Sequence, residues 1–294
     1  MLAERLLDPA TVRTASALLA ASPIDPGLER FCDPAPADPI ADQSTWADDV
    51  RTVEPATGRW HFIDLPLARG PRAAGTTAYR TFCAGGACIV DAIPAQFRRL
   101  RSARRAGERA AALRFLIHLV ADVHQPLHAA TNGDRGGNCL PVRYYRQVPK
   151  EGERGSFTPN LHAVWDGSSI RTLMARERLG DARALAEFIA RLRPLPAAVS
   201  AQEPTAARVL DWAEEASGVA NDVAYGRLPQ PVPIEPVDAV GLGSCQDNRD
   251  VGRRMRALNE RIGAAYERAS IPVLLGQLRL AAIRLAETLK AAFG

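Results

Sequence analysis

The segment FLIHLVADVHQPLH, residues 115–128, places three of the chain's five histidines and one aspartate in a mainly apolar stretch. His118 and Asp122 are four residues apart, so a helix would present both side chains on one face, one turn apart. Pro126 is expected to end that helix, and His128 just beyond it can turn back toward the same region. The spacing therefore predicts a helix whose end supplies ligands to a cation.

A second pair has the same spacing, because His162 and Asp166 stand four apart in NLHAVWD. Two further candidates lie upstream, Asp48 in STWADDVR and His61 in WHFIDLP. Imidazole nitrogens and carboxylate oxygens are ligands that suit Zn²⁺. One such pair alone is more often structural than metal-binding, but two pairs and a further histidine favour a metal centre. His124 falls on a different helical face from Asp122 and is expected to support the site or the core.

The rest of the chain favours helix, because Ala, Leu and Arg dominate and runs of β-branched residues are rare. A short helix is expected over Leu2–Leu7, and Asp8 followed by Pro9 is typical of the start of the next. The last helix is expected to break near Ser270–Pro272. This last helix is predicted at about 251–293, and the other helices at about 89–105, 109–124, 161–174, 180–192 and 204–224.

Three segments rich in Gly, Pro or Asp are predicted to lack helix. Residues 32–43 are expected to form a loop, residues 131–160 a loop or a short hairpin, and residues 228–238 an extended linker. No internal repeat is present. The predicted fold is therefore all-α, a helical bundle with long irregular loops around one core.

The net charge and the cysteine content exclude few classes of function. Lys and Arg exceed Asp and Glu by 37 − 33 = 4, which suits an anionic ligand but does not require one. No uninterrupted apolar run reaches the roughly 18 residues of a transmembrane helix, and the charged N-terminus does not resemble a secretory signal. Cys83 and Cys88 in CAGGAC are compatible with a disulfide or with two free thiols. Partners for Cys32, Cys139 and Cys245 cannot be assigned from sequence.

Five motifs in order, WADDVR, HFIDLP, HLVADVHQPLH, DRGGN and NLHAVWD, resemble those of the S1/P1 nuclease family. The likeness extends from about residue 2 to the C-terminal helix and includes CAGGACIVDAI and WAEEA. The resemblance implies a zinc-dependent single-strand nuclease and 3′-nucleotidase with the all-α fold of zinc phospholipase C. It also implies one domain over residues 1–294 and a disulfide between Cys83 and Cys88.

The family binds three zinc ions in a cleft, and the resemblance assigns two complete sites here. One zinc would be held by Asp48, His61, His118 and Asp122, and a second by His128, His162 and Asp166. Asp122 would bridge the ions. The third ion of the family uses an N-terminal Trp and a nearby His, whereas this chain begins at Met1 inside what resembles the first helix. We expect that a Trp/His segment is missing; a genuine two-zinc variant is the alternative.

The resemblance further implies hydrolysis by a metal-bound hydroxide, giving 5′-phosphorylated products. Arg51 would steady the phosphate in the transition state, and Asn138 would donate a hydrogen bond to it. Phe62 and Asp64 would bind a base, one by stacking and one by hydrogen bonding. The rival interpretations are a solvated surface arginine for Arg51, a plain turn for Asn138 and core packing for Phe62.

The implied partner is single-stranded nucleic acid or a nucleotide. A monomer without stable membrane association is expected, and the family implies that the protein is secreted or periplasmic. Two alternatives remain at this point: a zinc phospholipase C built on the same metals, or a truncated form that binds metal with little activity.

Overall fold

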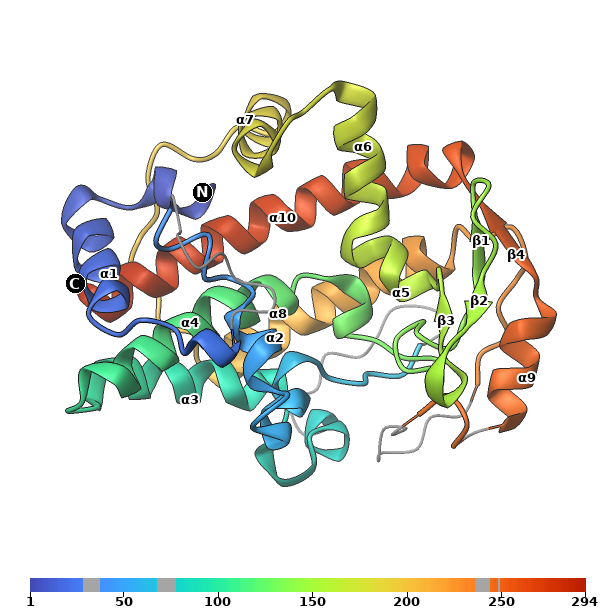
Figure 1. Cartoon of the computed structure of the whole chain (residues 1–294), viewed down its shortest axis with the longest axis horizontal. Helices are drawn as coiled ribbons and strands as arrows, with labels where there is room; N and C mark the ends of the chain where they lie inside the picture. The colour runs from blue at the N-terminus through green and yellow to red at the C-terminus, as the bar shows by residue number, and fades with distance from the viewer. Residues whose placement is uncertain (29–37, 68–77, 236–243, 248) are drawn as a thin grey trace.

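A computed structural model describes residues 1–28, 38–67, 78–235, 244–247 and 249–294. Helices dominate this part of the chain, as the composition predicts (Figure 1). The longest helix, α10 (Ala264–Phe293), crosses most of the molecule. It packs on α4 (Ala106–Asp122), and α4 packs on α3 (Ile89–Ser102), which also contacts α8 (Ala206–Val219).

Two clusters of buried apolar side chains form the main core. The first is built around α3, α4 and α8, and the second around α6 (Ser169–Glu177) and the N-terminal half of α10. The segment after α4 contributes to both, because Ala129 belongs to the first cluster while Leu127 and Ala130 belong to the second. The HQPLH motif therefore lies where the two clusters adjoin.

Several helices begin where their capping residues predict. Asp8 accepts hydrogen bonds from the backbone N–H groups of Ala10 and Thr11, and Pro9 opens α1 (Pro9–Ala20). Asp181 caps α7 (Ala182–Leu192) in the same way. The predicted helix over 161–174 is present as α5 (Leu161–Ala163), a π-helical turn at Val164–Ser168, and α6.

The C-terminal prediction is partly wrong. The segment 251–293 is not one helix broken near Ser270–Pro272 but α9 (Arg249–Ala257), the strand β4 (Glu260–Ile262) and an uninterrupted α10. Proline removes only one N–H from the helix ladder, and the packing of α10 on several helices outweighs that loss. The chain instead turns before β4, where Asn259 has a φ of 47°.

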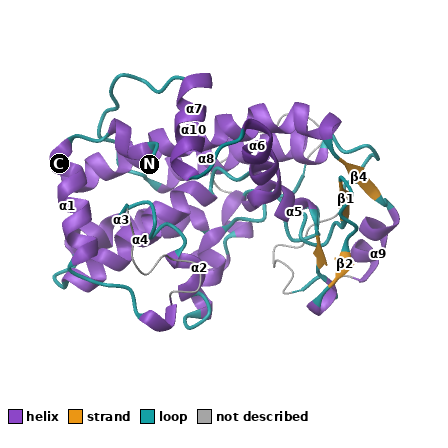
Figure 2. Ribbon diagram, turned by 45° about the horizontal axis from the view of Figure 1, so that its top comes forward, coloured by secondary structure: helices purple, strands orange, loops and turns teal. Residues whose placement is uncertain are grey.

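In the described part of the chain, four short strands lie together at one end of the molecule (Figure 2). β2 (Lys150–Glu151) and β3 (Phe157–Thr158) pair antiparallel, which confirms a short hairpin within 131–160. β1 (Val142–Tyr144) pairs in parallel with β4, and no sequence pattern predicts this contact. Residues 231–235 lack regular structure, as expected, whereas 32–37 and 236–238 of the predicted loops lie outside the described residues.

By length and composition, α10 is the one helix in the described ranges that could cross a membrane. A buried helix of a globular core meets the same criteria, and α10 packs against α1, α3, α4, α6 and α7. Contacts within the molecule therefore account for part of its apolar character, since 44% of its most apolar window is buried.

Glu260 in β4 offers a test of the packing at the end of the molecule that holds the short strands. Its side chain is buried and accepts a hydrogen bond from the Gln230 N–H at 3.2 Å. Burial raises the pKa of Glu260 to about 7, above its value in an unfolded chain. The folded state therefore loses stability as pH rises through 7, because an ionised carboxylate must stay buried. Glu260→Gln should raise the free energy of unfolding at pH 8.5. The gain at pH 8.5 should exceed the effect of the same substitution at pH 5 by on the order of 1–3 kcal/mol.

Urea unfolding at the two pH values measures this difference. Glu151→Gln, at an exposed position of β2, is the matched control and should change stability little at either pH. An equal effect of Glu260→Gln at both pH values would contradict the role of burial.

Candidate metal centre

The first group of candidate ligands comes from three separate elements. Asp48 lies on α2 (Trp46–Val50), His61 ends a 3₁₀ helix (Pro55–His61), and His118 lies on the last turns of α4. Their donor atoms are all within 4.8 Å of one another. His61 Nδ1 is 3.0 Å from His118 Nε2, while Asp48 Oδ1 lies 3.9 Å from His61 Nδ1 and Asp48 Oδ2 lies 3.9 Å from His118 Nε2.

The second group consists of His128, His162 and Asp166. His128 ends the short helix that Pro126 begins, while His162 and Asp166 lie on successive turns of the helix capped by Asn160. The Asp166 carboxylate is 3.5 Å from His128 Nε2 and 3.2 Å from His162 Nε2. The two imidazole rings stack with their centroids 5.0 Å apart.

Asp122 connects the two groups through its two oxygens. Oδ2 lies 2.9 Å from both His61 Nδ1 and His118 Nε2, and Oδ1 lies 3.4 Å from His128 Nδ1. The helical spacing of His118 and Asp122 and the turn after Pro126 produce this arrangement, as the sequence predicts. The carboxylate is therefore placed between two clusters of donor atoms.

Backbone carbonyls orient most of the imidazoles. Three histidines hydrogen-bond through Nδ1 at 2.7–3.0 Å, His118 to the Ser44 carbonyl, His128 to that of His61, and His162 to that of Gly136. Donation from Nδ1 leaves the lone pair on Nε2, which faces the cluster. His61 is oriented the other way, with Nδ1 toward the cluster and a buried Nε2 that has no hydrogen-bond partner among the described residues.

The donor set fits zinc. Tetrahedral zinc with ligands at 2.0–2.1 Å separates its ligand atoms by about 3.3 Å, within the range of the separations in both groups. Burial disfavours a charge on His118, yet Asp122 and Asp48 outweigh it and raise the pKa of His118 to about 9. Burial likewise opposes ionisation of Asp122, but His118 and His128 hold its pKa well below the usual range. The site therefore attracts positive charge.

Both groups open onto a cavity of about 690 Å³. A smaller hollow of about 150 Å³ adjoins it, lined by residues that include Phe62, Asp64 and Asn138. Phe62 is 36% exposed, so it is not a core side chain. Burial, with a contribution from the nearby Asp134 carboxylate, raises the pKa of Asp64 to about 6. The residues predicted for substrate binding are thus assembled beside the candidate ligands.

Arg51 also lines both hollows. Its guanidinium Nη2 lies 3.2 Å from Asp48 Oδ1, so Arg51 faces the first ligand group rather than bulk solvent alone. His124 lines the larger cavity but binds other partners, the Val120 carbonyl at 2.6 Å and Arg284 Nη1 at 2.9 Å. Burial and Arg284 lower the pKa of His124 to about 3, so this ring stays neutral and structural.

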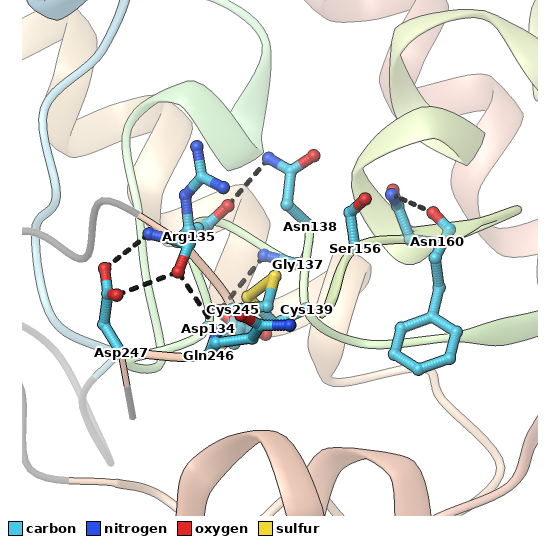
Figure 3. The surroundings of a disulfide bond; sticks show 12 residues. Asp134, Arg135, Gly137, Asn138, Cys139, Ser156, Asn160, Cys245, Gln246 and Asp247 are labelled. Atoms are coloured by element: carbon cyan, nitrogen blue, oxygen red, sulfur yellow. Dashed lines mark hydrogen bonds between the residues drawn. A yellow bond between two sulfur atoms is a disulfide. The ribbon is translucent and has the colours of Figure 1, made fainter. Parts of the chain in front are cut away.

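The DRGGN loop is held by a buried carboxylate and a disulfide (Figure 3). The fully buried Asp134 accepts hydrogen bonds from the Tyr225 hydroxyl at 2.8 Å and the Gly137 N–H at 3.0 Å. Cys139 is bonded to Cys245, a pairing that the sequence does not predict. The expected Cys83–Cys88 disulfide is confirmed, while Cys32 lies outside the described residues.

Gly136 in this loop cannot carry a side chain. Its φ is 58°, and a Cβ would lie 2.2 Å from the Leu127 carbonyl oxygen. Because the Gly136 carbonyl orients His162, Gly136→Ala should shift that ring and weaken metal binding by about 10–100-fold. Competition with a chromogenic chelator measures the affinity. Gly107→Ala, where no atom lies within 4 Å of the added Cβ, should leave it unchanged.

Sequence reasoning missed two side chains at the site. Gln125 Nε2 donates to Asp166 Oδ1 at 2.7 Å, and Arg135 lines both hollows. Both lie within the motifs HQPLH and DRGGN. Their direction depends on the local backbone, which for Arg135 is left-handed with a φ of 59°, and helical or strand spacing does not predict such directions.

A family model described as S1/P1 Nuclease matches residues 1–294. Nuclease S1 of Aspergillus oryzae is 29% identical over 179 residues, 59% of this chain and 58% of that protein. Nuclease P1 of Penicillium citrinum is 29% identical over 155 residues, covering 51% of this chain and 52% of that protein. Endonuclease 4 of Arabidopsis thaliana is 30% identical over 145 residues, which cover 46% of this chain and 44% of that protein. The chain thus spans about half the length of the curated relatives it matches.

Proposed function

Because the chain belongs to the S1/P1 nuclease family, we propose that it is a zinc-dependent phosphodiesterase. It cleaves single-stranded DNA or RNA, and 3′-nucleotides, to 5′-phosphorylated products. The observation that carries this proposal is the pair of His/Asp groups joined by Asp122 at the wall of one cavity.

The ligand sets follow from the two groups of donor atoms. Asp48, His61, His118 and Asp122 would hold one zinc ion, and His128, His162 and Asp166 would hold the other, with Asp122 placed between the two groups. When bound, zinc supplies Lewis acidity, which lowers the pKa of water and neutralises negative charge on a phosphate. The contribution of Gln125 is to orient the most exposed of these carboxylates, Asp166, by its hydrogen bond.

The remaining side chains bind and position the substrate. Arg51 places a cation next to the first group, where it stabilises negative charge on the phosphate oxygens. Asn138 lines both hollows and holds the loop through its hydrogen bond to the Arg135 carbonyl, so we assign it to the phosphate side of the substrate. Phe62 offers an exposed ring for stacking, and Asp64 offers a hydrogen-bonding group for a base.

The small hollow supports a preference for single strands. A base can reach Phe62 and Asp64 only if it leaves its stack and pair, which an unpaired nucleotide does at little cost. A stiff duplex presents its bases inside the helix. We therefore propose unpaired nucleic acid as the substrate class. The two disulfides in the described ranges favour an oxidising compartment, so we place the protein outside the cytoplasm, secreted or periplasmic. A monomer without stable membrane association is a separate part of the proposal.

Metal removal and a choice of substrates test the proposal. Dialysis against a chelator should abolish hydrolysis of a single-stranded oligonucleotide, and zinc should restore it. A duplex of the same sequence should be cut far more slowly, and the fragments should carry 5′-phosphates. Phosphatidylcholine micelles with zinc are the counter-substrate. Faster hydrolysis of the lipid than of the oligonucleotide would replace the nuclease by a phospholipase C.

A further inference from the structure

Two arginines lie where the two hollows meet. Arg51 and Arg135 each line both the larger cavity and the smaller hollow. They are the only Lys or Arg side chains among the described residues that line either one. A polyanionic substrate that occupies both hollows would therefore pass between these two guanidinium groups.

The two arginines differ in their partners. The Arg51 guanidinium is 3.2 Å from Asp48, so part of its charge is balanced by a candidate zinc ligand. The Arg135 guanidinium has no hydrogen bond or ion pair to any residue in the described ranges. Figure 3 shows it on the same side of the loop as the Asn138 amide and away from the Cys139–Cys245 disulfide. Arg135 is thus a cation at the site that forms no salt bridge with any carboxylate of the described residues.

The loop fixes the starting direction of the Arg135 side chain. A left-handed backbone costs a non-glycine residue about 1–2 kcal/mol, so an arginine at a φ of 59° needs compensating contacts. The Arg135 carbonyl accepts hydrogen bonds from Asn138 Nδ2 at 2.9 Å and Asn138 N at 3.2 Å. The neighbouring Asp134 is anchored to Tyr225. Hydrogen bonds at Asp134 and at Asn138 therefore fix the backbone of the turn, and the Arg135 guanidinium remains available to bind a ligand.

Arg135 lines the smaller hollow together with Phe62 and Asp64. The positive charge of Arg135 opposes the upward pKa shift that burial and Asp134 impose on Asp64, in agreement with the place of both residues in the lining of this hollow. Arg51, in contrast, contacts a ligand of the first metal group. The two arginines would consequently bind different ends of a nucleotide whose base enters the smaller hollow.

We propose that Arg135 forms a second phosphate subsite, which binds the 5′-phosphate of the nucleoside held in the smaller hollow. The proposal rests on the function proposed above and places this nucleoside on the 3′-oxygen side of the scissile bond, the side that leaves without the phosphate when the products carry 5′-phosphates. A guanidinium matches a phosphate with two charge-assisted hydrogen bonds, and here no internal ion pair must first be broken. The subsite therefore favours substrates that extend beyond the scissile bond on the 5′ side.

Two dinucleotides that differ by one phosphate test the subsite. Thymidine dinucleotide carries only the scissile phosphate, and its 5′-phosphorylated form carries the additional one. With the zinc-loaded protein, Arg135→Gln should lower kcat/KM about tenfold for the phosphorylated dinucleotide, mainly by raising KM, and at most about twofold for the other. Arg135→Lys should lose less activity than Arg135→Gln, because the ammonium group keeps the positive charge but lacks the paired N–H donors of a guanidinium.

Two comparisons separate the subsite from other roles. Arg135→Gly suits the left-handed turn and should reproduce Arg135→Gln, which excludes misfolding as the cause. Arg51→Gln should lower activity on both dinucleotides alike. Equal losses on both dinucleotides in Arg135→Gln, or no loss on either, would overturn the subsite, as would a drop in bound zinc that accounts for the loss.

Failure of the proposed function would be recognised separately. If the wild-type protein with zinc cleaves neither dinucleotide, calorimetric binding of thymidine 5′-phosphate is compared with that of thymidine. Binding that depends on the phosphate and is weakened about tenfold in Arg135→Gln would keep the subsite without the nuclease activity. Equal binding by both proteins would reject the subsite as well.

Discussion

Asp122→Asn is expected to lower kcat/KM for single-stranded DNA by about 10³-fold or more and to reduce the bound zinc. The reason is the position of Asp122 between the two ligand groups, with Oδ2 2.9 Å from two imidazole nitrogens and Oδ1 3.4 Å from a third. An amide keeps the shape but removes the negative charge and one acceptor. Elemental analysis and steady-state kinetics of the same preparation measure both effects.

A graded series gives this prediction its controls. Asp48→Asn should cost less, because Asp48 lies 3.9 Å from each imidazole and touches only the first group. Asp211→Asn, on the exposed face of α8, should leave zinc content and rate unchanged. If Asp122→Asn retained two zinc ions and near-normal turnover, the bridging role would be wrong.

The second large effect concerns stability. Removal of the Cys139–Cys245 disulfide by paired Cys→Ala substitutions should lower the free energy of unfolding by about 4–5 kcal/mol. This bond closes a loop of 106 residues, and a long loop gains more conformational entropy in the unfolded chain when it is opened. Chemical denaturation of the zinc-loaded wild type and variant measures the difference.

The other disulfide serves as an internal control. Cys83 and Cys88 are only 5 residues apart, so the same double substitution there should cost about 2 kcal/mol. Equal losses for the two pairs would contradict the loop-length argument. The Cys139–Cys245 variant should also raise KM, because Cys139 directly follows Asn138 in the loop that carries Arg135.

Local rules predicted much of this molecule. Asp8 with Pro9 marks a helix start, and the separation of His118 from Asp122 places two ligands on one face of α4. The same rule applies to His162 and Asp166. Such features depend on neighbours within one or two helical turns, so the sequence contains the information needed to recognise them.

Other features depend on residues that are distant in the chain. The pairing of β1 with β4 joins Val142 to Glu260, and the bond between Cys139 and Cys245 follows from the same approach of two remote segments. The break predicted at Pro272 failed because tertiary packing of α10 outweighs a local helix-breaking preference. The role of Arg135 was hidden by a left-handed backbone that no periodicity reveals.

Three of the candidate ligand imidazoles are anchored through Nδ1 to main-chain oxygens, at residues 44, 61 and 136. Every amino acid supplies that oxygen, so homologues are free to diverge in side chain at position 44 without disturbing the tautomer of His118. Damage should instead come from changes that bend the main chain, such as a new proline or a lost glycine. A saturation library selected for zinc retention should therefore show broad tolerance at Ser44 and near-invariance at Gly136.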